Sequence, residues 1–223
     1  MSAAHAPVTA NLAEALRDDE VHVWQLPYQA ATRRRPLLEL LAAYLGVDAS
    51  RIGLTDDVHG KPALAAPHAG SLRFNWSHSG SCAVVALGRH LELGVDVERR
   101  RPRPRALQIA ARYFTAAEAS ALAALPADER DDAFLQWWTA KEAVLKALGR
   151  GIAFGLHRLD IARVEGGLSL RQLEGHDAQA WQLQPLALPD PSLVAALAWQ
   201  GAPRTIRLYV PDRRGVPLAE RLP

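Results

Sequence analysis

The run Leu91-Glu-Leu-Gly-Val-Asp-Val-Glu98 alternates apolar and polar residues toward its end, and this pattern predicts a β-strand. Side chains two residues apart in a strand lie on the same face, so Asp96 and Glu98 are expected to point the same way. Their oxygens are the hard ligands that Mg²⁺ prefers, and Mg²⁺ usually takes only a few carboxylates together with phosphates. The strand therefore predicts one half of a metal site.

A long helix is predicted from about Asp128 to Leu148, where glycines follow. Its run Trp137-Trp-Thr-Ala-Lys-Glu-Ala-Val-Leu-Lys146 places Trp138, Glu142 and Lys146 at steps of four, on one slowly turning face. If this face meets the strand, Glu142 becomes a third carboxylate and Lys146 supplies a cation near bound phosphates.

A purely structural interpretation stands beside this one. Asp96 and Glu98 would then lie on a solvated strand face, and Glu142 with Lys146 would form a surface pair of small energetic weight. The two adjacent tryptophans would pack in a core, which is the commoner role of such side chains. The residues alone leave both interpretations open.

The remaining segments predict a chain that mixes helices and strands. A helix is expected over Arg35–Leu45, and the capping box Thr115–Glu118 begins another that ends near Pro126. Strands are expected at 71–76, at 82–87 and, in short antiparallel runs, between 152 and 209. Loops are expected at 60–70, at the polar 77–81 and at the proline-punctuated 99–105.

Two parts of the sequence echo one another. Ser81-Cys-Ala-Val-Val-Ala-Leu87, a turn and Leu91–Val95 are followed much later by Ser192-Leu-Val-Ala-Ala-Leu-Ala198, a turn and Ile206–Val210. Such an echo is a weak indication of two similar halves, because short apolar strand pairs also look alike by chance.

The composition is that of an ordinary globular protein. Its 223 residues are 49% hydrophobic, enough for a buried core, and a formal net charge of +2 does not indicate a nucleic-acid binder. The single cysteine, Cys82, excludes an internal disulfide and a multi-cysteine zinc site. The start has no signal-peptide pattern, and no segment approaches the roughly 20 apolar residues of a membrane span. We therefore expect a soluble, cytoplasmic protein.

Four sequence blocks, taken in order, resemble the 4'-phosphopantetheinyl transferase superfamily, in its surfactin-synthetase-activating, Sfp-like type. Any one block is a weak signal, whereas the ordered set is specific. The blocks are Gly60-Lys-Pro62, Phe74-Asn-Trp-Ser-His-Ser-Gly80, Gly94-Val-Asp-Val-Glu98 and Trp138-Thr-Ala-Lys-Glu-Ala143. Outside roughly 33–151 the agreement weakens.

The resemblance implies an α+β fold of two similar halves related by a pseudo-twofold duplication. Each half would be a small antiparallel sheet packed with helices, and the active site would lie between them. We expect the halves to span 1–95, with the coenzyme A-binding residues, and 96–223, with the metal-binding and catalytic residues. A monomer follows from this pseudo-dimeric type.

The implied reaction moves the 4'-phosphopantetheine arm of coenzyme A to a serine of an apo acyl or peptidyl carrier protein. Adenosine 3',5'-bisphosphate would be released, and Mg²⁺ would assist. Asp96, Glu98 and Glu142 would hold the metal, with Glu142 as the general base and Glu98 as the second candidate. Lys146 and Lys141 would neutralise phosphate charge.

The family pattern also implies contacts to coenzyme A. Ser77 and His78 would bind the 3'-phosphate and nearby phosphates, although a lone histidine is more often structural. Lys61 and Pro62 would flank the adenine or its phosphates, and Arg35 would reach the 3'-phosphate. Arg33 and Arg34 are further candidates at the same helix start.

Partner contacts have two interpretations each. The arginines of 99–105 would steer an acidic carrier protein, or form a solvated loop. Phe114, Leu122 and Leu125 would offer the carrier an apolar contact, or face the core. Rival functions are a non-catalytic coenzyme A or carrier-protein binding module and a basic nucleic-acid binder, for which the sequence has no motif. The carrier, the acyl tolerance and the choice between Mg²⁺ and Mn²⁺ stay open.

Overall fold

The computed structural model of the chain describes residues 12–211 and 217–221. The beginning of the chain, where the sequence predicts no targeting signal, lies outside the described residues. In chain order the helices are α1 (Leu12–Ala15), α2 (Arg35–Leu45), α3 (Ala106–Tyr113), α4 (Ala116–Ala124) and α5 (Ala127–Leu148). The strands are β1 (Glu20–Pro27), β2 (Leu54–Asp56), β3 (Pro62–Leu64), β4 (Arg73–Ser79), β5 (Cys82–Gly88), β6 (Leu93–Arg99), β7 (Leu159–Val164), β8 (Gly167–Leu173), β9 (Trp181–Leu186), β10 (Leu193–Gln200), β11 (Thr205–Pro211) and β12 (Pro217–Arg221).

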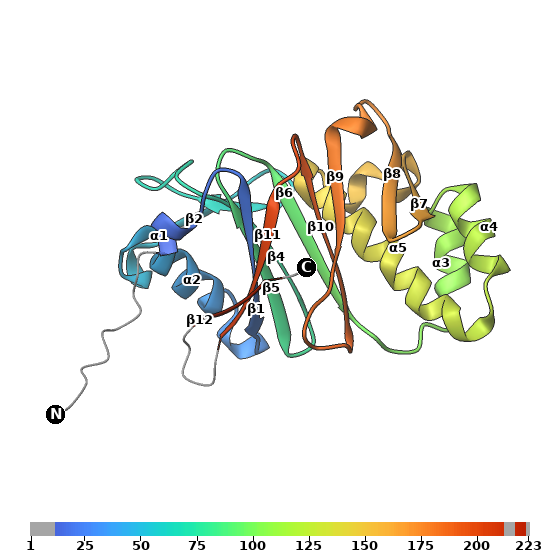
Figure 1. Cartoon of the computed structure of the whole chain (residues 1–223), viewed down its shortest axis with the longest axis horizontal. Helices are drawn as coiled ribbons and strands as arrows, with labels where there is room; N and C mark the ends of the chain where they lie inside the picture. Colours follow the sequence, from blue (N-terminus) through green and yellow to red (C-terminus); the bar gives the residue numbers. More distant parts are fainter. Residues whose placement is uncertain (1–11, 212–216, 222–223) are drawn as a thin grey trace.

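The α+β fold predicted from the sequence is confirmed. A five-stranded sheet has the order β12-β11-β1-β5-β4, and a three-stranded sheet has the order β6-β10-β9. Two small hairpins, β2–β3 and β7–β8, complete the described sheets. In Figure 1 α2 covers the five-stranded sheet on one side of the molecule, and α3, α4 and α5 lie on the other side, beyond the three-stranded sheet.

Alternating side chains bury both faces of the two sheets, as expected of strands packed between layers. Val85 packs in one cluster with α2, and its neighbour Val84 packs in a second cluster with Val97 of the other sheet. On the far face of that sheet Ala196 packs in a third cluster with Val144 of α5. The order of layers is therefore helix, sheet, sheet, helix.

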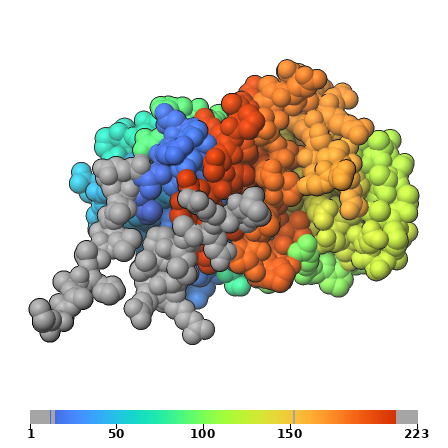
Figure 2. All heavy atoms as spheres, in the orientation of Figure 1, coloured from blue at the N-terminus to red at the C-terminus, as the bar shows by residue number. Residues whose placement is uncertain are grey.

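Each sheet receives a strand that follows an interior strand of the other. β5 lies inside the first sheet, between β1 and β4, but the next strand, β6, pairs with β10 of the second sheet. β10 is central in the second sheet, but the next strand, β11, pairs with β1 of the first. In Figure 2 these late strands, in red and orange, accordingly lie between the blue N-terminal part and the yellow-green helices.

The echoed segments are therefore alike in one respect, since each forms an interior strand followed by a strand that crosses to the other sheet. This is what the predicted duplication requires, and the duplication itself stays a prediction. The predicted division after residue 95 falls inside β6, so neither half as numbered contains a whole copy of that strand.

Local sequence signals explain the ends of the helices. α2 has Pro36 in its first turn and ends at Gly46, whose φ of 65° is the left-handed conformation that glycine adopts without strain. α4 begins at a complete capping box, in which Thr115 and Glu118 each bond the other's backbone N–H. These predictions are confirmed.

Three details differ from the sequence predictions. β4 continues to Ser79, so most of the predicted polar loop 77–81 is strand, and only Gly80 and Ser81 form the turn. β3 lies within the predicted loop 60–70, because it pairs with β2. β11 runs parallel to β1, although only antiparallel strands were expected there, because the crossing brings it back alongside the first strand.

Candidate active site

The close approach of α5 to β6 positions the central residues of the site. A Cβ atom at Gly94 would lie 2.1 Å from the backbone oxygen of Ala143, so only glycine fits at this point of the strand. Less than one turn after Ala143, Lys146 reaches the same strand, and its Nζ lies 2.7 Å from Oδ1 of Asp96. The predicted meeting of the helix face with the strand is therefore observed for this pair.

Glu142 completes the cluster from the same helix. Its side chain is buried, and its Oε1 atom has no hydrogen-bond partner among the described residues. Burial, together with the negative charges of Asp96 and Glu98 and against the opposing effect of Lys146, raises the pKa of Glu142 to about 7. A buried carboxylate with an unpaired oxygen and a pKa near neutrality is typical of a functional site.

Asp96 lies deeper than the other carboxylates. Burial raises its pKa, although Lys146 and the Ser77 hydroxyl, which donates to Oδ1 at 2.7 Å, act in the opposite direction. The ammonium group of Lys146 also donates to the carbonyl oxygen of Val95, at 3.3 Å. Asp96 and Lys146 therefore form the fixed centre of the cluster.

Polar side chains of β4 bridge the two sheets at this place. β4 and β6 are edge strands of different sheets, and three alternate residues of β4 bond to β6. Asn75 accepts a bond from the N–H of Val95 at 2.9 Å, Ser77 bonds Asp96, and Ser79 donates to Glu98 at 3.2 Å. Both carboxylates of β6 therefore meet β4 from the same face, as predicted.

The three carboxylates do not lie close enough together to form a metal site in this structure. Within residues 12–211 and 217–221, no group of three or more acidic, histidine or cysteine side chains lies close enough together to hold a metal ion. Their nearest cations are protein groups, since Lys146 contacts Asp96 and Arg103 donates to Glu98 at 2.8 Å. The donor set nevertheless fits a divalent cation that prefers oxygen, because Oε1 of Glu142 is buried without a partner and the charges of two further carboxylates, Asp96 and Glu98, act on this residue.

A pocket of about 260 Å³ opens beside Glu142 and Lys146. Cationic and aromatic residues share its wall with the carboxylate, which suits an anionic ligand with a planar part. The other lining residues are Arg34, His59, Gly60, Lys61, Pro62, Asn75, Trp76, Gly149 and Gly151.

Four predicted contact residues take different positions around this pocket. Lys61 and Pro62 line it, and the Lys61 ammonium donates to Glu92 at 3.0 Å. Ser77 points to Asp96, whereas His78 lies on the opposite face of β4 and stacks on Tyr28 with ring centres 4.1 Å apart. The structure therefore separates Ser77 and His78, which the sequence grouped together.

The arginines at the start of α2 also separate. Arg34 lines the pocket and pairs with Asp56 at 3.0 Å. Arg35, which the sequence favoured, has a side chain 74% exposed that pairs with Glu39 on its own helix. Arg34 is therefore the better-placed candidate for an anion.

The predicted phosphate role of Lys141 is not supported. Lys141 is fully buried on another face of α5, 2.7 Å from Glu118, and its ammonium also donates to the carbonyl oxygens of Leu156 and Leu159. All three hydrogen atoms of the ammonium group have an acceptor there. Lys141 therefore joins α5 to α4 and to the segment that follows α5.

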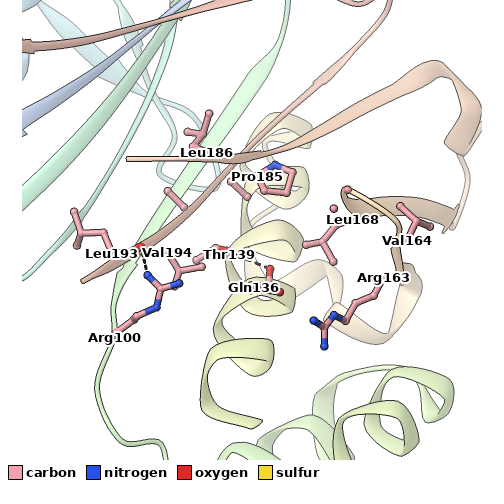
Figure 3. A pocket seen from close by; sticks show the side chains of 14 residues that line it. Arg100, Gln136, Thr139, Arg163, Val164, Leu168, Pro185, Leu186, Leu193 and Val194 are labelled. Atoms are coloured by element: carbon pink, nitrogen blue, oxygen red, sulfur yellow. Dashed lines mark hydrogen bonds between the residues drawn. The ribbon is translucent and has the colours of Figure 1, made fainter. Parts of the chain in front are cut away.

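A larger cavity, of about 420 Å³, lies between α5 and strands β9 and β10 (Figure 3). Gln136 and Thr139 line it from the helix, and Arg163 reaches it from β7. Its described lining residues include no carboxylate, and its other arginine, Arg100, is bonded to Asp132 and to Leu193. We therefore place the candidate site at the smaller pocket, which Glu142 and Lys146 line.

The predicted carrier-contact residues face the core. Phe114 and Leu122 are buried in the cluster around α5, and Leu125 packs against it. Trp137 is likewise buried, and its indole N–H donates to the carbonyl oxygen of Ile161.

In the part of the chain that the structure describes, no helix is long and apolar enough to cross a membrane.

Sequence reasoning missed several residues of the site. Arg103 was grouped with its neighbouring arginines, and Asn75 and Ser79 lie in a matched block but received no role. The signal for these two was present, because Asn75, Ser77 and Ser79 alternate with period two, as Asp96 and Glu98 do. Arg34 and Arg35 are adjacent at the start of α2, and the sequence does not show which of them faces the pocket.

Comparison with known proteins identifies the family of the chain. The sequence pattern described as the 4'-phosphopantetheinyl transferase superfamily matches residues 92–198, which include β6 and α5. The chain is 34% identical over 219 residues to the 4'-phosphopantetheinyl transferase HetI of Nostoc sp., covering 83% of this chain and 90% of that protein.

Two other relatives match over a shorter part. The 4'-phosphopantetheinyl transferase Sfp of Bacillus subtilis is 31% identical over 131 residues, covering 58% of this chain and 56% of that protein. The human L-aminoadipate-semialdehyde dehydrogenase-phosphopantetheinyl transferase is 27% identical over 183 residues, covering 74% of this chain and 59% of that protein. With the near full-length match and the site of β6 and α5, the chain belongs to the 4'-phosphopantetheinyl transferase superfamily.

Proposed function

We propose that the chain moves the 4'-phosphopantetheine arm of coenzyme A to a serine of an apo acyl or peptidyl carrier protein. The observation that carries this proposal is the buried Glu142, whose free oxygen lies in a cluster with Asp96, Glu98 and Lys146 beside a pocket that Arg34 also lines. The names of the relatives, all of them phosphopantetheinyl transferases, support it.

The proposed reaction is a phosphoryl-type transfer without a covalent enzyme intermediate. The serine oxygen of the carrier forms a bond to the phosphorus that bears the pantetheine arm. The bond from this phosphorus to the bridging oxygen of the pyrophosphate breaks, and adenosine 3',5'-bisphosphate leaves. The serine proton passes to a carboxylate of the enzyme, so no serine nucleophile is needed in this chain.

Glu142 is our choice for the general base. A pKa of about 7 leaves a substantial fraction of the carboxylate ionised at neutral pH, as a general base requires. Glu98 is the second candidate, because its side chain is partly exposed and reaches the same cluster. Lys146 would stabilise the charge that develops on the phosphates.

Asp96, Glu98 and Glu142 would hold Mg²⁺, or Mn²⁺, which favours similar ligands. When bound, the metal would supply Lewis-acid stabilisation of the pyrophosphate oxygens. Arg34, Lys61 and Pro62 would bind the nucleotide part of coenzyme A in the pocket that they line. His78 and Arg35 would contact the 3'-phosphate, as the family resemblance implies, from positions outside the pocket lining.

The proposal includes a monomer in the cytoplasm. One chain supplies both sheets and every candidate residue, so no second copy is required. Among the arginines of 99–105, Arg101 and Arg105 are exposed and make no ion pair within the described residues, which leaves them to attract an acidic carrier.

Intact mass of an apo carrier protein tests the function. Incubation with the enzyme, coenzyme A and Mg²⁺ should add one phosphopantetheine group, and a chelator should prevent the addition. Glu142→Gln should lose the transfer while keeping its circular dichroism and melting temperature. Glu174→Gln, which changes an exposed carboxylate paired with Arg158, is the matched control and should retain transfer. A folded wild-type protein that modifies none of several unrelated apo carriers would refute the proposal.

A further inference from the structure

We propose that Arg103, together with Ser79, is a positioning residue that fixes the orientation of the Glu98 carboxylate. The inference rests on the proposed function, in which Glu98 is a metal ligand or a base. It separates Arg103 from the other arginines of 99–105 and gives it a role at the reaction centre.

One oxygen of Glu98 receives both donors. A guanidinium nitrogen of Arg103 lies 2.8 Å from Oε2, and the Ser79 hydroxyl donates to the same atom at 3.2 Å. The hydroxyl itself accepts from the backbone N–H of Arg99 at 3.0 Å, which directs its hydrogen atom toward Glu98. Oε1 receives no hydrogen bond from the described residues, so this oxygen stays available for a ligand or a proton.

The backbone holds Arg103 firmly in place. Its N–H donates to Asp131 in the first turns of α5 at 3.0 Å, and its carbonyl oxygen accepts from the N–H of Ala106 at 2.8 Å. Pro102 and Pro104 on either side fix their own φ angles and restrict the residues before them. Because Arg103 makes both contacts through its own backbone, replacement of its side chain leaves the segment anchored.

The other arginines of the run have different surroundings. Arg99 bonds Ser192, and Arg100 bonds Asp132 and the carbonyl oxygen of Leu193. Arg101 is exposed, whereas the side chain of Arg103 is 20% exposed, and its Nε is buried without a partner among the described residues. Only Arg103 of this run contacts a carboxylate of the candidate site.

A charge-assisted bond to a carboxylate is among the stronger hydrogen bonds in proteins and sets its geometry. Residues that orient metal ligands in this way typically change activity or metal affinity by about 10- to 100-fold when they are replaced. Arg103→Gln should therefore lower kcat by about 10- to 100-fold. The KM values for coenzyme A and for the carrier should stay within about twofold, because Arg103 contacts neither in this assignment.

Comparison of five variants tests the inference by steady-state kinetics. Ser79→Ala should lower kcat less than Arg103→Gln, because a neutral donor is lost instead of a charged one. Arg103→Lys should recover part of the lost kcat, because an ammonium group restores a charged donor. Arg101→Gln should instead raise the carrier KM at low salt. Arg171→Gln, at an exposed position of β8, should change neither kcat nor KM.

Crystal structures of wild type, Arg103→Gln and Arg171→Gln give a result that does not depend on turnover. In Arg103→Gln the Glu98 carboxylate should leave its place over the Ser79 hydroxyl, whereas in Arg171→Gln it should stay. An unmoved carboxylate, or an unchanged kcat in Arg103→Gln, would overturn the inference. Absence of transfer by the wild-type protein would overturn the proposed function instead, and the crystal structures would still decide the positioning role.

Discussion

Lys141 and Lys146 of one helix each pair with a carboxylate at 2.7 Å, yet the two pairs differ in burial and in surroundings. Lys141 and Glu118 have side chains that are 0% and 2% exposed, deep in the cluster around α5. Lys146 is 25% exposed, contacts Asp96, and lines the pocket beside the unpartnered Glu142. The ion-pair distance alone therefore says nothing about role.

The two pairs differ in how many hydrogen-bond acceptors surround the ammonium group of the lysine. Lys141 has three oxygen acceptors and also lies 5.1 Å from the centre of the Phe114 ring. Lys146 has Asp96 and one carbonyl oxygen, and its exposed side faces a cavity. A cation whose bonds are all internal holds a fold together, and a cation with access to a pocket can bind a ligand. Three experiments test this difference and a fourth probes another buried ionisable group, from the largest expected effect to the smallest.

Lys141→Met should be the most damaging change to stability. It leaves Glu118 buried without its cation, which typically costs about 3–5 kcal/mol in the free energy of unfolding. Urea unfolding followed by circular dichroism measures the loss. The double variant Lys141→Met with Glu118→Gln should recover part of it, since glutamine keeps the capping interaction and carries no charge. A single variant within about 1 kcal/mol of wild type would show that the pair is not needed.

Lys146→Met should have the opposite profile. We expect transfer to fall by about 100- to 1,000-fold, the usual cost of removing a group that stabilises developing charge. Because this side chain is partly solvated, the loss of stability should be clearly smaller than in Lys141→Met. The measurements are kcat with an apo carrier and the same urea unfolding. Equal stability losses in the two variants, with transfer retained in Lys146→Met, would erase the distinction.

Gly94→Ala should weaken the Lys146 pair while sparing the Lys141 pair. The new methyl group would lie 2.1 Å from the backbone oxygen of Ala143, so β6 and α5 must move apart. Such overpacking typically costs about 1–3 kcal/mol, and the displaced Asp96 should lower kcat as well. Gly53→Ala is the control, because its methyl group would meet only the side chain of Ala65, at 3.2 Å. Full activity in Gly94→Ala would contradict the tight contact.

The smallest expected effect is on the pH dependence of stability. It involves a buried group of polar side chains in the five-stranded sheet. His22 is fully buried between Tyr44 at 2.6 Å and Glu20 at 3.3 Å, with Tyr209 and Arg207 nearby, and burial lowers its pKa from 6.5. The unfolded chain then binds a proton more readily than the folded one. Stability should therefore decrease as the pH falls below 6.5, until the lowered folded pKa is passed.

Melting temperatures between pH 7.5 and pH 5 check this expectation. His22→Gln should have a shallower dependence on pH than wild type, whereas His157→Gln, at an exposed position, should keep the wild-type dependence. Identical slopes in all three proteins would place the acid sensitivity elsewhere, for example at the two lysine pairs.

Local sequence patterns predicted most of the elements and the centre of the site. The period of the residues around Asp96 and the helical spacing of Glu142 and Lys146 are local properties. The contact of Lys146 with Asp96 agrees with them, and the roles of these residues stay predictions. The same spacing sets Lys141 about 140° around the helix from Lys146, so the separation of the two lysines was available in principle. The family resemblance, which treats the whole block as one motif, concealed it.

The contacts of Arg103 and of β11 could not be predicted in this way. Both depend on which distant segment lies beside them, and neither has a local pattern that names its partner. Ser79 was hidden because the predicted loop began at Ser77, whereas pairing with β5 extends β4 to Ser79. Long-range pairing therefore decided the parts that the sequence left open.

The parallel pairing of β1 with β11 has a consequence for biosynthesis. On the ribosome β1 emerges early, but its second neighbour, with Thr205 opposite Glu20, is made only near the end of the chain. Until then one backbone edge of β1 stays open, and open strand edges promote pairing with other chains. Nascent chains stalled before β11 should therefore need chaperone protection, and the enzyme should become folded only after almost all of it has been translated.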